Sequence, residues 1–157
     1  MPDDRRDLIA QLKNRALIYL EIYDALSEEL GAARAESLLA RAIERRGRSA
    51  GRALAQFAPA DFDGLCQAFL KGVPGEGALF APEIRRCDAN GIEIQFHACP
   101  LKEAWEEAGL APEKRALLCR IAGRVDKGMF EGAGFGIDNR TWTPGAAGCC
   151  FLSIRRA

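Results

Sequence analysis

One carboxylate stands on the apolar side of a predicted helix that begins at Pro112 and ends between residues 131 and 134. At 100° per residue, the apolar side chains of this helix form one stripe, made of Leu118, Ala122, Val125 and Met129. Asp126 lies at the shoulder of the stripe, two turns beyond Cys119 on nearly the same side. Because a buried carboxylate needs a partner, Asp126 is either a structural residue that caps a loop or pairs with an arginine, or a carboxylate of a functional site.

A cysteine and the single histidine form a second candidate pair. Pro100 suits the first turn of a helix, so Cys99 is the expected N-cap of that helix. The backbone N–H groups and the helix dipole would lower the pKa of a thiol at this position. His97 would lie on the same strand face, and a Cys–His pair is typical of nucleophilic catalysis. A small buried cysteine and a structural histidine are the alternative.

The stretch from Asn139 to Phe151 has the highest density of candidate residues. Arg140 has the planar group that holds a carboxylate through two hydrogen bonds. Strand alternation places Cys150 on the core side, with Cys149 and Phe151 on the opposite side.

Metal and dinucleotide sites are not indicated. His97, Cys99, Cys119 and Cys149 are zinc-type ligands, but no Cys-x-x-Cys or His-x-x-x-His pair anchors them. The glycines at 132, 134 and 136 follow a helix, whereas a dinucleotide-binding loop leads from a strand into a helix. We therefore expect no metal and no cofactor.

The elements that must position these residues are helices first and strands later. Helices are predicted at about 7–30 and 35–57, followed by a short helix that Asp61 caps. Asn90-Gly91 predicts a hairpin of strands 83–87 and 92–98. Helices at 100–109 and from 112, then strands at 135–141 and 148–155, complete the chain. The expected fold is one α+β domain over residues 1–157, with N-terminal helices followed by antiparallel strands mixed with two further helices.

The first helix also carries a second apolar surface. Leu17, Ile18 and Ile22 lie off its main stripe. They either pack within the monomer or form the contact of a homodimer through the N-terminal helices.

Composition limits the classes of partner. The 22 basic and 22 acidic side chains cancel and divide evenly between the two halves, which argues against nucleic acid and anionic membranes. No apolar run approaches the ~20 residues of a membrane span, and the acidic N-terminus lacks the pattern of a secretory signal. The six cysteines are therefore expected as free thiols in a cytoplasmic protein that acts on a small molecule.

From Cys99 to Phe151 the sequence resembles the L-2-amino-thiazoline-4-carboxylic acid hydrolase family. The shared pattern is Cys99-Pro100, Cys119 with Asp126, Arg140-Thr141-Trp142-Thr143, and Gly145 leading to Cys149-Cys150-Phe151. The chain departs from the family at Gly136-Ile137, where an Asn-Pro-like turn is usual, and at Ala146-Ala147, where acidic residues are common. Cys119 also lies further from Asp126 than the pattern leads us to expect. The fold should therefore carry over better than the substrate.

The resemblance implies that a cyclic isothiourea is opened at C2 to give an N-carbamoyl cysteine. Asp126 would pair with the amidinium-like N–H groups, and Cys99 or Cys149 would attack C2 or orient water. Arg140 would bind the substrate carboxylate. The further expected substrate-binding residues are His97, Cys119, Thr141 and Thr143.

Other classes remain open. The layout also resembles the 4-vinyl-reductase-like and Bet3-like ligand-binding domains, in which a pocket holds an apolar molecule, or an acyl chain on a cysteine, and no bond is hydrolysed. A binding or sensor module is thus the alternative to a hydrolase, and an inactive dimeric scaffold is a third interpretation.

Overall fold

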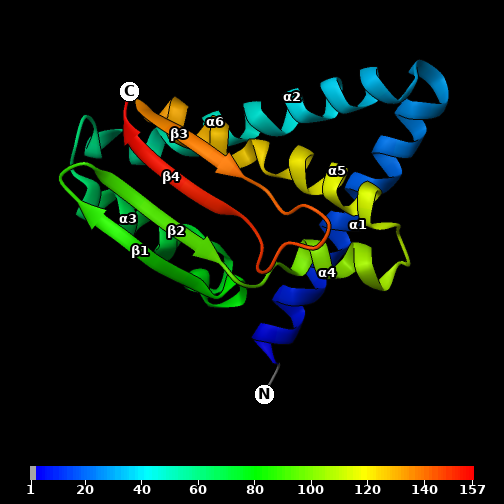
Figure 1. Cartoon of the computed structure of the whole chain (residues 1–157), viewed down its shortest axis with the longest axis horizontal. Helices are drawn as coiled ribbons and strands as arrows, with labels where there is room; N and C mark the ends of the chain where they lie inside the picture. The colour runs from blue at the N-terminus through cyan, green and yellow to red at the C-terminus, as the bar shows by residue number, and fades with distance from the viewer. Residues whose placement is uncertain (1–2) are drawn as a thin grey trace.

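The computed structural model describes residues 3–157, and it begins with two long helices. In Figure 1 the first rises from the N-terminus toward the upper right, and the second turns back along the top of the view. They are α1 (Asp4–Leu30) and α2 (Ala32–Gly51), and they meet at Gly31. Gly31 has a φ of 84°, a conformation that favours glycine, and its N–H donates to the Ser27 carbonyl at 2.9 Å. The predicted second helix changes type after Gly51, because residues Arg52–Phe57 form the 3-10 helix η1.

A short helix and a turn-rich segment lead from these helices to the sheet. Helix α3 (Phe62–Gly72) begins as predicted, since the Asp61 carboxylate accepts a hydrogen bond from the Gly64 N–H at 3.0 Å. The 3-10 segment η2 (Pro74–Phe80) then turns the chain toward the first strand.

The sheet has four strands in the order β1-β2-β4-β3, and every neighbouring pair is antiparallel. The strands are β1 (Pro82–Asp88), β2 (Gly91–Phe96), β3 (Phe135–Arg140) and β4 (Phe151–Arg156). The predicted hairpin is confirmed, with Asp88 opposite Gly91 at its turn. A side chain at position 91 would overlap the Ile154 carbonyl of β4, so glycine is also needed for strand packing.

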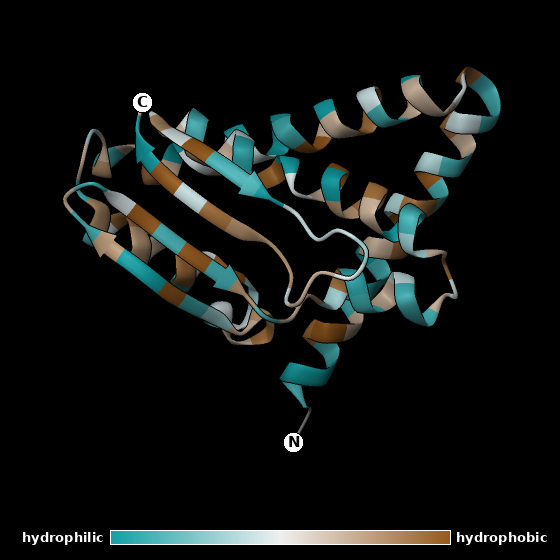
Figure 2. Ribbon diagram, viewed as in Figure 1, coloured by the Kyte–Doolittle hydropathy of each residue, from teal (hydrophilic) through white to brown (hydrophobic). Residues whose placement is uncertain are grey.

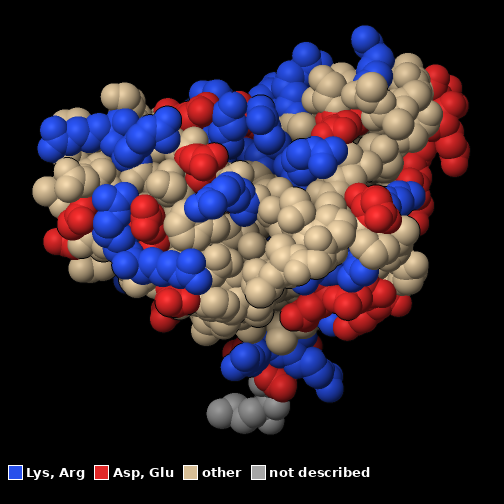
Figure 3. Space-filling model, viewed as in Figure 1, with Lys and Arg blue, Asp and Glu red and all other residues tan. Residues whose placement is uncertain are grey.

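The helices lie on one side of the sheet. In Figure 1, α2, α3 and α6 lie behind the strands, and the other sheet face is uncovered. Hydrophobic and hydrophilic residues alternate along β2 in Figure 2, and its core-facing Ile92 and Ile94 are fully buried. On the uncovered side, acidic and basic side chains are interspersed around an uncharged surface (Figure 3).

Three helices connect β2 to β3: α4 (Pro100–Glu107), α5 (Pro112–Ala122) and α6 (Arg124–Gly132). The prediction of one continuous helix from Pro112 is wrong, because the chain breaks into α5 and α6 at Gly123. The Gly123 carbonyl accepts a hydrogen bond from Asn139 Nδ2 at 3.0 Å. An added Cβ at Gly123 would lie 2.6 Å from Thr141 Cγ2, so the end of β3 packs directly against the break.

Helices α2 and α6 pack unusually closely. A Cβ added at Gly47 would overlap the Val125 carbonyl, and one added at Gly128 would overlap the Glu44 carbonyl. The lack of a side chain at these positions lets the two backbones touch. This contact fixes the place of α6, and therefore of Asp126.

The hydrophobic core is divided into two clusters. The first joins α1, α2, α4 and α5 around Trp105, whose indole N–H donates to the Ala16 carbonyl at 2.8 Å. The second joins the sheet to α3 and α6 around Phe69 and Phe130. The prediction of a single α+β domain with helices before strands is confirmed. Over residues 3–157, no helix is both long and apolar enough to cross a membrane.

Candidate functional site

A cavity of about 360 Å³ lies between the two core clusters. Side chains from all six α-helices, from the end of β2 and from the loop before β4 line it. Its titratable and thiol-bearing lining residues are Arg15, Cys99, Cys119, Asp126, Cys149 and Cys150. The structure thus brings together four of the residues that the sequence singled out, namely Cys99, Cys119, Asp126 and Cys149.

The cysteines reach the cavity from three elements. Cys99 is the N-cap of α4, as predicted, and Cys119 lies in the last turns of α5. Cys149 and Cys150 belong to the loop before β4, which starts at Phe151, later than predicted. Both cysteines therefore line the cavity, and the predicted strand alternation does not extend to them.

Hydrogen bonds hold this loop against the end of β2. The Cys149 N–H donates to the Phe96 carbonyl at 2.8 Å, and the Phe96 N–H donates to the Cys150 carbonyl at 2.9 Å. The Gln95 amide donates to the same carbonyls, at 2.9 Å to Phe96 and 3.3 Å to Cys150. Gln95 therefore fixes the backbone from which both thiols project.

Asp126 is the only carboxylate among the lining residues, and it lies in the first turn of α6. Burial raises the pKa of its carboxyl group to about 7, and the Arg15 guanidinium opposes this rise only in part. The Asn139 amide donates to Asp126 Oδ2 at 3.5 Å. Asp126 keeps some accessible surface, which is consistent with a carboxyl group that faces the cavity. A pKa near 7 makes both of its charge states available at neutral pH.

The cavity thiols are protonated at neutral pH. Burial raises the pKa of Cys99 to about 11, although the backbone N–H groups of Lys102 and Leu101 oppose the rise. Burial likewise raises the pKa of Cys119 to about 12 and that of Cys149 above its ordinary value. The expectation of a lowered pKa at Cys99 is therefore wrong, because burial outweighs the helix N-terminus. A thiol of this cavity needs a base or a nearby cation before it can act as a nucleophile.

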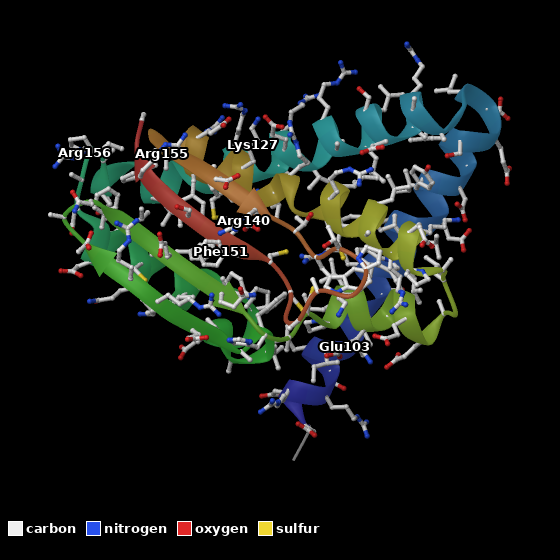
Figure 4. All side chains as sticks on the ribbon, viewed as in Figure 1. Glu103, Lys127, Arg140, Phe151, Arg155 and Arg156 are labelled. Carbon is white, nitrogen blue, oxygen red and sulfur yellow. The ribbon has the colours of Figure 1, made fainter. Side chains whose placement is uncertain are left out.

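Four predicted site residues lie outside the cavity lining. His97 is exposed and its Nε2 lies 2.7 Å from Glu83 Oε2 on β1. The Arg140 guanidinium lies over the Phe151 ring, 4.5 Å from its centroid, on the uncovered side of the sheet (Figure 4). Thr143 is exposed on the loop after β3. Thr141 is half-buried against Gly123, next to the cavity but outside its lining.

Arg15 of α1 is the site residue that sequence reasoning missed. It is exposed and lines the cavity, which places it at the mouth, and its charge acts on Asp126. Little in the sequence marks Arg15 as a site residue, because its only distinction is to adjoin the buried Ala16 at the edge of the apolar stripe of α1. Many surface arginines occupy such edges and extend to solvent.

The rest of the lining is apolar. It includes Leu54 of η1, Phe69 of α3, Phe80 of η2, Phe96 of β2 and Met129 of α6. Within residues 3–157, no group of three His, Cys, Asp or Glu side chains is arranged to hold a metal ion. All six cysteines are free.

The family model for L-2-amino-thiazoline-4-carboxylic acid hydrolase matches residues 11–152. The chain belongs to this family. The match covers nearly the whole chain and extends well beyond the 99–151 stretch in which the motifs were recognised. It includes Arg15 on α1 as well as the cysteines and Asp126. A search of curated proteins found no match.

Proposed function

We propose that the chain is a hydrolase that opens a small cyclic isothiourea or amidine of the L-2-amino-thiazoline-4-carboxylate type. The observation that supports this most directly is one carboxylate, Asp126, together with four thiols in a single cavity of a member of this family. Water is added across C2 and the C2–S bond breaks, which gives a free thiol and an N-carbamoyl cysteine-type product.

Asp126 acts on the amidine part of the substrate. In its ionised form it accepts hydrogen bonds from the N–H groups of the cationic ring, as a carboxylate does with a guanidinium. Attack at C2 moves the C=N electrons onto a nitrogen and discharges the cation, so this pairing acts by keeping the ring in its protonated, electrophilic form and by orienting C2 for attack. The Asp126 carboxyl group is buried, and the lower dielectric around it strengthens this interaction.

The thiols supply the nucleophile or position it. A cationic ring bound among the cysteines favours their thiolate form, so substrate binding itself lowers the barrier that burial creates. Cys99 or Cys149 then attacks C2 and expels the ring sulfur, and water releases the carbamoyl product and regenerates the cysteine. In the alternative route the thiols orient a water molecule that attacks C2 directly.

Arg15 binds the substrate carboxylate in this proposal. It lines the cavity, whereas Arg140 packs on Phe151 and does not. A guanidinium at the mouth would let the carboxylate remain partly hydrated while the amidine lies deeper, near Asp126.

Turnover of L-2-amino-thiazoline-4-carboxylate, followed by thiol release, tests the function. We expect Asp126→Asn to lower kcat/KM by at least about 100-fold, the usual effect of losing a charge-stabilising group. Arg15→Gln should raise KM, and Cys99→Ala and Cys149→Ala should identify the nucleophile. Arg140→Gln and His97→Ala are matched controls outside the cavity. Full activity of well-folded Asp126→Asn would refute the proposed mechanism.

A ligand-binding module without hydrolysis is the second candidate. The apolar part of the lining and the protonated thiols support it, because neither needs catalysis to explain it. Native mass spectrometry of the purified protein would decide between the two. A retained apolar ligand, together with no turnover of the ring, would favour the binding module.

We also propose a cytoplasmic location, which the free cysteines support, and a homodimer through α1. The dimer is supported by the exposure of Leu17, Ile18 and Ile22, at 40%, 48% and 41%. A large part of each of these side chains stays uncovered, so the second apolar surface of α1 is open to a partner.

A further inference from the structure

The cavity is larger than the ring that the proposed function places in it. Its volume of about 360 Å³ falls within the ~300–1,000 Å³ that pockets for drug-sized molecules occupy. A thiazoline with only an amino group and a carboxylate is much smaller than such ligands and would leave part of this space unfilled.

The polar lining groups account for one part of the cavity. The Arg15 charge acts on Asp126, and the Asp126 charge in turn acts on Cys150, so these groups lie near one another. The charges of Cys99 and Cys149 likewise act on Cys150 and raise the pKa of its thiol. A ring that pairs with Asp126 and presents its carboxylate to Arg15 is therefore held among these residues.

The remaining lining offers this ring no polar partner. Met129 lies one turn beyond Asp126 on the same side of α6, and the lining continues from it to Leu54, Phe69, Val73 and Phe80. All five belong to the second core cluster or pack against it. Empty apolar space beside the ring gains free energy when an apolar group fills it.

We propose that the natural substrate is a cyclic amidine or isothiourea that carries an apolar substituent of several carbons, and that this substituent occupies the space lined by Leu54, Phe69, Val73, Phe80 and Met129. This inference rests on the proposed function and names the substrate class of the same site. Asp126 and Arg15 recognise the ring, and the apolar lining selects the substituent. A ring without the substituent is a poorer substrate of the same reaction.

The test compares kcat/KM for thiol release from L-2-amino-thiazoline-4-carboxylate and from the same ring with a butyl group on C5 or on the exocyclic nitrogen. Burial of the butyl chain should raise kcat/KM at least about tenfold for one of the two derivatives. Ala68→Leu adds a larger side chain to the α3 lining and should remove most of that preference. Ala55→Leu makes the same change on the exposed side of η1 and should keep the preference.

The outcomes separate the two proposals. Preference for the butyl ring, lost in Ala68→Leu and kept in Ala55→Leu, supports the inference. If wild type opens the unsubstituted ring at least as well as both derivatives, the inference is overturned and the hydrolase stands. If wild type opens none of the three rings, the proposed function fails and the inference falls with it. The comparison of the three rings with wild type decides between these outcomes even if a variant does not fold. Thermal melting would reveal a variant that does not fold.

Discussion

Asp126 combines a buried position with a pKa of about 7, so its ionisation should set the pH dependence of the reaction. Only the carboxylate form pairs with a cationic ring, and the fraction of carboxylate rises as pH increases through 7. We expect kcat/KM to rise through an apparent pKa near 7 when thiol release is measured from about pH 5 to about pH 9. Asp126→Asn should abolish this limb along with most activity. A wild-type profile that falls through the same range would instead assign Asp126 the role of a general acid.

The same pKa has a consequence for stability. The carboxyl pKa is 3.8 in an ordinary environment and about 7 in the folded chain. Between these values the folded state holds a proton that the unfolded state has released, so stability falls as pH rises across that window. We therefore expect Asp126→Asn to be more stable than wild type at pH 8, by roughly 2–4 kcal/mol at ~1.4 kcal/mol per pKa unit.

Urea denaturation followed by circular dichroism would measure this difference. Below about pH 4 the advantage of Asp126→Asn should largely disappear, because the carboxyl group is then protonated in both states. An equal advantage at both pH values would show that packing, and not ionisation, is the cause. A carboxylate that lowers stability where the reaction needs its charge is a typical feature of an active site.

At the scale of elements, the contact between α2 and α6 is the feature that fixes Asp126. Because the two backbones touch at Gly47 and Gly128, a methyl group at either position must push the helices apart. We expect Gly128→Ala to lower the free energy of unfolding by about 1–3 kcal/mol, the usual cost of overpacking. It should also lower activity, because it displaces Asp126. Equilibrium unfolding in urea and the turnover assay would measure the two effects.

Gly72→Ala is the matched control for this change. Gly72 is the last residue of α3, and an added Cβ there meets nothing within 4 Å. We expect this variant to be as stable as wild type or slightly more so, since alanine favours the helix. Equal stability of Gly128→Ala and Gly72→Ala would contradict the close packing of α2 and α6.

Local signals in the sequence predicted the elements well, and contacts between distant segments explain the failures. The cap at Asp61, the turn at Asn90-Gly91 and the helix start at Cys99-Pro100 each depend on adjacent residues and were correctly placed. The break at Gly123 depends on Asn139 of β3, which the helical pattern could not reveal. The protonated state of Cys99 depends on burial by several elements, which a helix N-terminus alone does not indicate.

At the scale of the whole molecule, the cavity lies where the two core clusters meet. Its polar residues come from positions as far apart as Arg15 and Cys150, and no continuous segment contains the site. This is why the motifs predict the cysteines and Asp126, which line the cavity, together with Arg140, which does not. Arg140 belongs to a motif on the uncovered sheet face, whereas Arg15 at the cavity mouth belongs to the first helix and to no motif.

The uncovered apolar surface of α1 leads to a prediction about assembly. Ile18 is 48% exposed and lies beside Leu17 and near Ile22 on the same helix, so a charge at this position should prevent association of two copies without disturbing the core. We expect wild type to sediment as a dimer at micromolar concentration and Ile18→Glu to sediment as a monomer. Leu30→Glu makes the same change at the 47% exposed end of the helix, away from this group, and should remain dimeric. A wild-type monomer in sedimentation velocity would show that α1 does not mediate a stable dimer. Because Arg15 lies on the same helix, turnover measured across the dissociation range would also show whether association affects the cavity mouth.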